Sequence, residues 1–190
     1  MKRRQGSSVD QYFEADIKEM IEIKKYIINS LKLNSARLYF HPFDAKSKES
    51  WMALDEVIPK TGSGAIVVEG LLQYFSKIEI KNFFRNLREF MSKRTVVLIS
   101  SDFPLRQYYD LLLQTIPEAK SLNSERTKVT GVDIYHQAFK SSYDREMLFD
   151  EMGFVGTEYH QMDLTKGISA IEKPSLEFLP HLSVFELAIK

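Results

Sequence analysis

Two short apolar runs, separated by an amphipathic helix pattern, constrain the fold of this chain more than any other feature. Residues 65–69 (AIVVE) form an unbroken apolar run that ends in a carboxylate, and residues 94–101 (RTVVLISS) form a second. Such runs are typical of strands that are buried on both faces of a parallel sheet. Between them, Ser76 and Glu79 form a capping-box pattern before a helix with one apolar face. The sequence therefore predicts a strand, helix and strand of an α/β protein.

The rest of the chain repeats this alternation. Strands are predicted at residues 9–16, 36–43, 154–162 and 184–189, and helices at residues 17–31, 51–57, 105–113 and 142–152, the last ended by Gly153. The polar segment 114–137 has no clear pattern, so we interpret it as a lid or substrate loop. We expect one domain over residues 9–190, with helices on both faces of a mostly parallel sheet that has an antiparallel C-terminal strand. Residues 1–8 are interpreted as a disordered lead-in.

Composition excludes several classes of protein. Lys plus Arg and Asp plus Glu both number 26, so there is no overall basic field to attract nucleic acid. The chain has no cysteine, and its apolar runs fall short of the roughly 20 residues of a membrane span. Its four histidines show no metal-ligand spacing. We expect a cytoplasmic protein that binds no nucleic acid, membrane or metal, and we leave the formation of a homo-oligomer open.

Acidic residues stand where the predicted strands end. Glu14 and Asp16 close the first strand, Asp44 follows the second, and Glu69 closes the third. Ligands of open α/β sheets bind outside the carboxyl ends of the strands. Carboxylates at these places can accept hydrogen bonds from ribose hydroxyls or from an adenine amino group, so they are candidates for an adenosine-binding site.

Each of these carboxylates also has a purely structural interpretation. Asp16 stands where a helix N-cap belongs, with Glu19 three residues later, and Asp44 lies in a loop whose composition favours a turn. Glu69 follows four apolar residues, so it needs a partner, which is either a ligand or a structural ion pair. The residues alone leave these alternatives open.

Residues 64–84, 12–25 and 40–51 carry a family resemblance: they resemble segments of the leucine carboxyl methyltransferase family of class I S-adenosylmethionine-dependent O-methyltransferases. Residues 64–84 (GAIVVEGLLQYFSKIEIKNFF) look like that family's pattern of an acidic residue, Gly, apolar residues and Tyr after a strand. Residues 12–25 (YFEADIKEMIEIKK) resemble its ribose-binding strand end, and residues 40–51 (FHPFDAKSKESW) resemble its adenine-side loop. The segments occur in the family's order, and the resemblance extends over residues 9–190.

The resemblance implies a Rossmann-like methyltransferase sheet and S-adenosylmethionine as the cofactor. Asp16, with Glu14 beside it, would bind the ribose hydroxyls. Asp44 and the backbone of Ala45 would hold the adenine. Glu69 would lie near the methionine part of the cofactor.

The resemblance also implies methyl transfer to a carboxylate or hydroxyl of a small molecule or a peptide end. Tyr74 would face the cofactor or substrate pocket. Arg106, just past the strand at 94–101, is a candidate to hold an anionic acceptor, and a solvated surface charge is the alternative for it. The reaction needs no metal, and a carboxylate acceptor needs no strong general base.

The chain departs from the family's pattern before its first strand. Family members have a central strand and a glycine-rich loop there, whereas the glycines at 62 and 64 of this chain precede a strand and are interpreted as a turn. In the family's strand order the absent strand lies between those at 9–16 and 65–69. We therefore expect an N-terminally incomplete sheet that closes the gap directly, borrows a strand or is marginally stable. The alternative function is a degenerate methyltransferase fold that works as an interaction module without activity.

Overall fold

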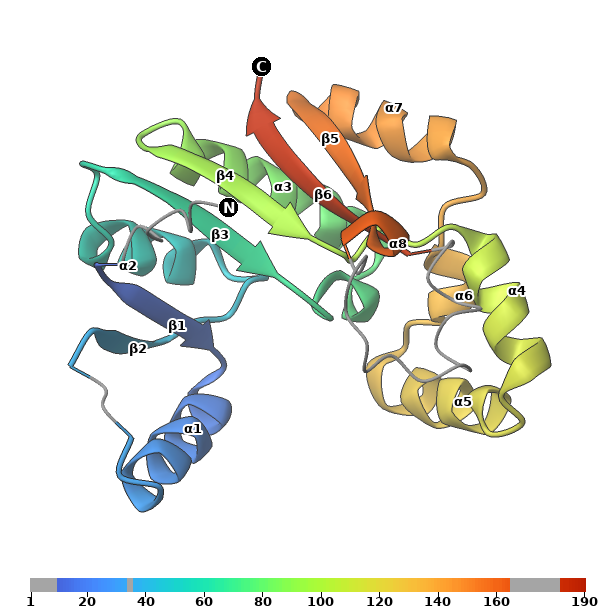
Figure 1. Ribbon diagram of the computed structural model, residues 1–190, viewed down its shortest axis with the longest axis horizontal. Helices are drawn as coiled ribbons and strands as arrows, with labels where there is room; N and C mark the ends of the chain where they lie inside the picture. The colour runs from blue at the N-terminus through green and yellow to red at the C-terminus, as the bar shows by residue number, and fades with distance from the viewer. Residues whose placement is uncertain (1–9, 34–35, 165–181) are drawn as a thin grey trace, which may run out of the picture. The chain divides into compact units, whose positions relative to one another are not determined.

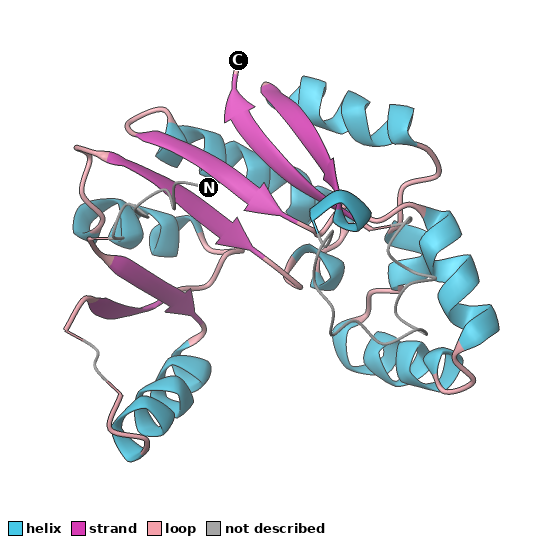
Figure 2. Cartoon of the chain, viewed as in Figure 1, coloured by secondary structure: helices cyan, strands magenta, loops and turns pink. Residues whose placement is uncertain are grey.

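The computed structural model describes residues 10–33, 36–164 and 182–190. The chain divides into two compact units, Met1–Pro59 and Lys60–Lys190, here called unit 1 and unit 2. Figures 1 and 2 show their helices and strands. The predicted lead-in at residues 1–8 lies outside the described residues, and the single domain over residues 9–190 stays a prediction.

Unit 1 contains two strands, each followed by a helix. In chain order they are β1 (Tyr12–Asp16), α1 (Lys18–Ser30), β2 (Leu38–Pro42) and α2 (Lys48–Val57). β1 and β2 run parallel, from the pair Tyr12 and Leu38 to the pair Asp16 and Pro42. The two strands therefore end at the same edge of the sheet. The described apolar side chains that unit 1 buries are Ile21, Ala45, Trp51 and Leu54.

Unit 2 is built on a mixed sheet. In chain order its elements are β3 (Ser63–Val68), η1 (Leu72–Tyr74), α3 (Lys77–Met91), β4 (Thr95–Ser100), α4 (Arg106–Thr115), α5 (Ala119–Thr130), α6 (Ile134–Gln137), α7 (Ser142–Met152), β5 (Phe154–His160), α8 (Gln161–Leu164) and β6 (Ser183–Ile189). The strand order is β3, β4, β6 and β5. β3 and β4 are parallel, and β6 is antiparallel to β4 and to β5. The predicted α/β fold and its antiparallel C-terminal strand are confirmed.

An aromatic core joins the helices of unit 2 to its sheet. The ring centroid of Phe103, which follows β4, lies 4.9 Å from that of Phe149 on α7 and 5.6 Å from that of Phe185 on β6. Phe84 of α3 is fully buried against the same cluster, 6.0 Å from Phe103. In Figure 1, α3 and α7 lie along the same side of the four-stranded sheet. These rings bury large apolar areas, so they are expected to dominate the stability of unit 2.

Local signals placed the ends of two helices correctly. At the start of α3, the Ser76 side chain accepts the backbone N–H of Glu79, and the Glu79 side chain accepts the N–H of Ser76. The predicted capping box is therefore confirmed. α7 ends at Gly153, which has a φ of 79° and so adopts the left-handed conformation that favours glycine.

The interpretation of residues 114–137 as a loop is wrong. This segment contains the last two residues of α4, then α5 and α6. Gly131, with a φ of 72°, ends α5, and the side chain of Asp133 caps α6 by accepting the backbone N–H of Tyr135. α5 buries only Ala119 among its residues, so it has no apolar stripe that would have predicted a helix.

The prediction that residues 65–69 are buried on both faces is also wrong. β3 is largely exposed, and 66% of Val67 is accessible to solvent. β3 is the end strand of its sheet, with β4 as its only paired neighbour in the described part of the chain. An apolar run of this kind shows what a strand can bury, but the strand order decides what it does bury.

The sheet is divided where the sequence predicts an absent strand. β1 pairs with β2 in one sheet, and β3 begins the other. Of the three expected outcomes, the pairing pattern contradicts direct closure of the gap. Borrowing of a strand and marginal stability stay predictions. None of the helices in the described ranges is long and apolar enough to cross a membrane.

Candidate functional site

The carboxyl edge of the β1–β2 sheet in unit 1 holds the first group of predicted site residues. Asp16 is the last residue of β1, and its backbone C=O accepts the N–H of Phe43 at 2.7 Å. This bond extends the parallel pairing by one step beyond Pro42. Asp44 is the next residue, so the loop that carries it begins beside the end of β1. The structure thus brings Asp16 and Asp44 to one edge of one sheet, as the sequence predicts.

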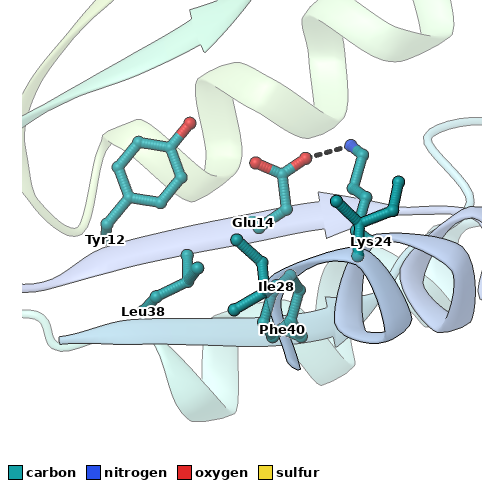
Figure 3. A pocket seen from close by; sticks show the side chains of 7 residues that line it. Tyr12, Glu14, Lys24, Ile28, Leu38 and Phe40 are labelled. Carbon is teal, nitrogen blue, oxygen red and sulfur yellow. Dashed lines mark hydrogen bonds and ion pairs between the residues drawn. The ribbon is translucent and has the colours of Figure 1, made fainter. Parts of the chain in front are cut away.

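Lys24 of α1 forms ion pairs with both carboxylates of β1. Its ammonium donates to Asp16 Oδ2 at 2.8 Å and also pairs with Glu14 (Figure 3). Burial by itself lowers the pKa of Lys24, but the hydrogen bonds to Asp16 and Glu14 outweigh it and raise the pKa. Lys24 is therefore charged at neutral pH and holds the two carboxylates together. The sequence analysis did not predict these ion pairs.

Asp16 is not the N-cap of α1. The N-cap position is taken by Ile17, and no side chain caps the helix. Asp16 lies one residue too early, and its Oδ1 accepts the N–H of Ile17 at 2.8 Å. The interpretation of Asp16 as a helix N-cap is therefore wrong. The structural role of its side chain is instead an ion pair with Lys24.

An apolar pocket lies beside Glu14 on the same sheet. It has a volume of about 290 Å³ and lies between α1 and the face of the β1–β2 sheet. Its lining residues are Tyr12, Glu14, Lys24, Ile27, Ile28, Leu38 and Phe40 (Figure 3). Burial, the Glu14 charge and a hydrogen bond to Glu14 raise the pKa of Tyr12. The ion pair of Glu14 and Lys24 thus forms the polar end of a mostly apolar pocket.

The loop after β2 is held by a tight turn and by a tryptophan. Asp44 Oδ1 accepts the N–H of Lys46 at 2.9 Å, which forms the turn that the sequence left as an alternative. Asp44 Oδ2 makes no hydrogen bond to any described residue. The indole N–H of the buried Trp51 donates to the backbone C=O of Ala45 at 3.0 Å. Asp44 therefore has both a structural role and one carboxylate oxygen left for a ligand.

The second group of predicted residues lies in unit 2, after β3. Glu69 directly follows the strand, and Tyr74 ends the short helix η1 with 41% of its surface exposed. Arg106 is the first residue of α4, and its guanidinium carbon lies 5.1 Å from the ring centroid of Tyr135. No hydrogen bond or ion pair joins Glu69, Tyr74 and Arg106 to one another in the described part of the chain. Arg106 is half-buried against an aromatic ring, so it is not the freely solvated charge of the alternative interpretation.

Asp102 is the residue of this region that the sequence analysis missed. Its carboxylate accepts the backbone N–H groups of Gly70, Leu71 and Leu72 at 2.6, 2.6 and 2.8 Å. Burial raises the pKa of Asp102, and the charge of Glu69 adds to this, although the three N–H donors oppose it. An acidic residue directly after a predicted strand was the signal that found Glu69, and Asp102 follows the strand at 94–101 in the same way.

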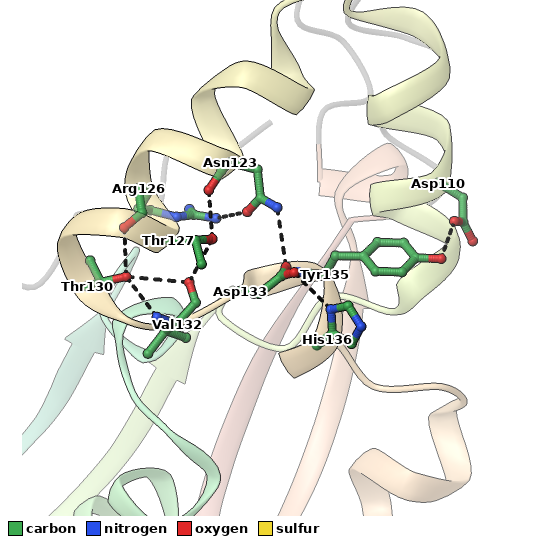
Figure 4. Close-up of polar contacts among 9 residues, drawn as sticks. All are labelled: Asp110, Asn123, Arg126, Thr127, Thr130, Val132, Asp133, Tyr135 and His136. Atoms are coloured by element: carbon green, nitrogen blue, oxygen red, sulfur yellow. Dashed lines mark hydrogen bonds and ion pairs between the residues drawn. The ribbon is translucent and has the colours of Figure 1, made fainter.

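Hydrogen bonds between polar side chains connect η1 to α5 and to the start of α6. Arg126 of α5 donates to the Gln73 side chain at 2.9 Å, and Gln73 donates to the C=O of Gly70 at 3.0 Å. Arg126 also donates to Asn123, which in turn donates to Asp133 (Figure 4). The segment that the sequence suggested as a lid is thus bonded to the loop that carries Tyr74.

In the parts of the chain that the structure describes, no group of three or more His, Asp or Glu side chains could hold a metal ion. His136, one of the four histidines, is exposed and pairs with Asp133 at 2.8 Å. That contact fixes the start of α6.

Comparison with known proteins gives matches of structure and none of sequence. No family model and no curated protein matches the chain. A DUF574 family protein from Streptomyces avermitilis is 12% identical with a TM-score of 0.55, over 94% of this chain and 64% of that one. A SAM-dependent methyltransferase from Anabaena variabilis is 10% identical with a TM-score of 0.55, over 95% of this chain and 77% of that one.

A third solved structure is an O-methyltransferase family protein from Burkholderia thailandensis, 11% identical with a TM-score of 0.50 over 95% of this chain. The chain spans 44% of that protein's length and 64% of the Streptomyces protein's length. At such low identity the likeness is one of fold alone. The chain has the Rossmann-like α/β fold of S-adenosylmethionine-dependent methyltransferases.

Proposed function

We propose that this chain carries the cofactor-binding part of an S-adenosylmethionine-dependent O-methyltransferase. The observation that carries the proposal is the shared carboxyl edge of β1 and β2, where Asp16 and Asp44 follow parallel strands that end together. Ligands of open α/β sheets bind at this edge, and two carboxylates there suit the hydroxyl and amino groups of an adenosine. The likeness of fold to methyltransferases supports the same class of ligand.

The residues of unit 1 fit an adenosine by their chemistry. Asp44 Oδ2 is available to accept from a ligand, while the turn and the Trp51 indole hold the backbone of Ala45 in place. Asp16 would accept from the ribose hydroxyls, and Lys24 would stay paired with Glu14. The cofactor supplies an electrophilic methyl group on a sulfonium sulfur. The role of these side chains is to bind and orient it.

For the acceptor we propose a carboxylate or a hydroxyl of a small molecule or a peptide end. A carboxylate is already anionic at neutral pH, so no strong general base is required. Arg106 of unit 2 is the candidate to pair with such an anion, since it is held in place by the Tyr135 ring. The exposed Tyr74 is the candidate to contact the acceptor.

Calorimetric titration with S-adenosylhomocysteine tests the proposal. We expect the purified chain to bind S-adenosylhomocysteine with a Kd in the micromolar range. Asp16→Asn and Asp44→Asn are each expected to weaken binding about tenfold or more. Asp10→Asn is the matched control, since Asp10 is exposed and precedes β1 at the opposite end of the strand. No binding by a chain whose circular dichroism shows it to be folded would overturn the proposal. Equal loss in all three variants would overturn the assignment to this edge.

A second candidate function is an interaction module that has lost methyl-donor binding. It is favoured by the division of the sheet between β1 and β3 and by Lys24, which already pairs with Asp16 and Glu14. The titration distinguishes the two, because only the enzyme requires the ligand to bind. Transfer of a labelled methyl group from S-adenosylmethionine to a panel of carboxylic acids, alcohols and peptides then tests the acceptor.

A further inference from the structure

One edge strand of the protein lacks the features that keep sheet edges from pairing. The two sheets of the described residues have four edge strands, β1, β2, β3 and β5. β1 contains Glu14 and Asp16, β2 ends at Pro42, and β5 contains Glu158. β3 (SGAIVV) contains no charged residue, histidine or proline. Natural edges are usually protected by such residues, so the edge of β3 is the one suited to accept another strand.

The geometry of β3 is also that of a strand ready to pair. It is matched to β4 without interruption from Ser63 with Thr95 to Val68 with Ser100, so no bulge twists the edge away. Ser63, Gly64, Ala65 and Val67 are exposed. Within residues 10–33, 36–164 and 182–190, the second edge of β3 therefore pairs with no strand, and Val67 on it is exposed.

The charges that flank β3 indicate which strand fits. Lys60 lies before its start and Glu69 directly after its end. When such a strand pairs antiparallel with an identical one, the positive end of each meets the negative end of the other. In a parallel pairing of two copies, like charges would lie side by side. β3 is thus complementary to itself in the orientation that a two-fold axis produces.

We propose that the protein forms a homodimer in which β3 of one copy pairs antiparallel with β3 of a second copy. The two four-stranded sheets become one continuous sheet, and the exposed Val67 side chains are covered. A formal net charge of zero at pH 7 leaves little long-range repulsion between copies. The proposal does not rest on methyl transfer: of the predicted site residues it uses only Glu69, and only as the negative charge that follows β3.

Sedimentation velocity over a broad range of protein concentrations tests the dimer. The full chain is expected to show a reversible equilibrium of monomer and dimer, and Val67→Lys to raise the dimer Kd about tenfold or more. Val155→Lys is the matched control: Val155 lies on β5 at the opposite edge of the same sheet, and it is 55% exposed. We expect this variant to dimerise like the unmodified chain. Circular dichroism confirms that both variants fold.

A charge pair on Ser63 tests the orientation of the strands. In the antiparallel dimer, Ser63 lies near Glu69 of the other copy, so Ser63→Glu is expected to weaken the dimer and Ser63→Lys to retain or strengthen it. A chain that is monomeric at every concentration overturns the proposal. So does a dimer that Val67→Lys leaves unchanged, or one that Val155→Lys disrupts to the same extent. If Ser63→Glu strengthens the dimer and Ser63→Lys weakens it, the antiparallel arrangement is overturned.

Discussion

The carboxylate of Asp102 accepts the backbone N–H of Gly70 at 2.6 Å, and this bond ties the loop after β3 to the end of β4. Gly70 has a φ of 69°, and this left-handed turn directs the N–H groups of Leu71 and Leu72 to the same carboxylate. Three donors are thus satisfied by one side chain. The loop that leads to Tyr74 owes its shape to a residue about thirty positions later in the chain.

Asp102→Ala is expected to be among the most destabilising substitutions of a polar residue in unit 2. A buried donor that loses its partner costs about 1–3 kcal/mol, and the substitution leaves three such N–H donors. Because water partly rehydrates the loop, we expect less than the sum of the three costs, a total loss of about 2–4 kcal/mol in the free energy of unfolding. Urea denaturation followed by circular dichroism measures it. Asp110→Ala is the control, because Asp110 accepts one bond, from the Tyr135 hydroxyl. Equal effects of the two substitutions would contradict the anchoring role.

Tyr109 is expected to make the free energy of unfolding fall as the pH becomes alkaline. Burial raises its pKa to about 12, against about 10 for a tyrosine in the unfolded chain. The folded state thus keeps a proton that the unfolded state has lost. This contribution to stability is complete below about pH 10 and disappears as the pH rises through about 12.

Tyr109→Phe has no proton to lose, so its free energy of unfolding should fall less between about pH 9 and about pH 12 than that of the unmodified chain. The expected difference is about 2 kcal/mol. Tyr143→Phe serves as the control, because 66% of Tyr143 is exposed. If the unmodified chain and Tyr109→Phe lose stability in parallel over this range, Tyr109 does not carry the effect.

The ion pairs of Lys24 should contribute more to unit 1 than an ordinary surface pair does. Lys24→Met leaves Glu14 and Asp16 to repel each other, and we expect a loss of about 1 kcal/mol that shrinks at high salt. Lys25→Met is the matched control, since Lys25 has one exposed partner, Glu22, on its own helix. Its expected effect is below about 0.5 kcal/mol. Urea denaturation at low and high NaCl measures both, and a loss in Lys24→Met that is insensitive to salt would argue against an electrostatic origin.

Trp51 allows the stability of unit 1 to be measured separately. It is the single tryptophan of the chain and is buried in unit 1. Only four described apolar side chains are buried in unit 1, against seventeen in unit 2. Because buried apolar area is the main source of stability, we expect unit 1 to unfold before unit 2. Trp51 fluorescence should then change at a lower urea concentration than the circular dichroism signal of the helices at about 222 nm. Coincident transitions would show instead that the two units unfold as one.

Much of the secondary structure could be predicted, because it depends on residues close together in sequence. The capping box of Ser76 and Glu79, the end of α7 at Gly153 and the antiparallel C-terminal strand are confirmed. α5 could not be predicted, because its polar sequence has no apolar stripe and its helix is held by bonds such as that from Arg126 to Gln73.

The candidate site was predicted in part for the same reason. The positions of Asp16 and Asp44 at strand ends follow from the strands themselves, and the structure places them at one edge. The partners of these carboxylates were not predictable, since Lys24 lies eight residues after Asp16 on the next helix, and Asp102 reaches Gly70 across η1, α3 and β4.

The sequence by itself thus determined most of the strands and helices outside residues 114–137, where several of them end, and that Asp16, Asp44 and Glu69 stand at strand ends. Propensity, caps and periodicity act within a few residues, so they can be read along the chain. Only the tertiary structure decided that the strands form two sheets, that β3 is an exposed edge and that Asp102 anchors the loop after it. Strand order and long-range hydrogen bonds depend on which distant segments meet, and the free energy of the whole fold settles that choice.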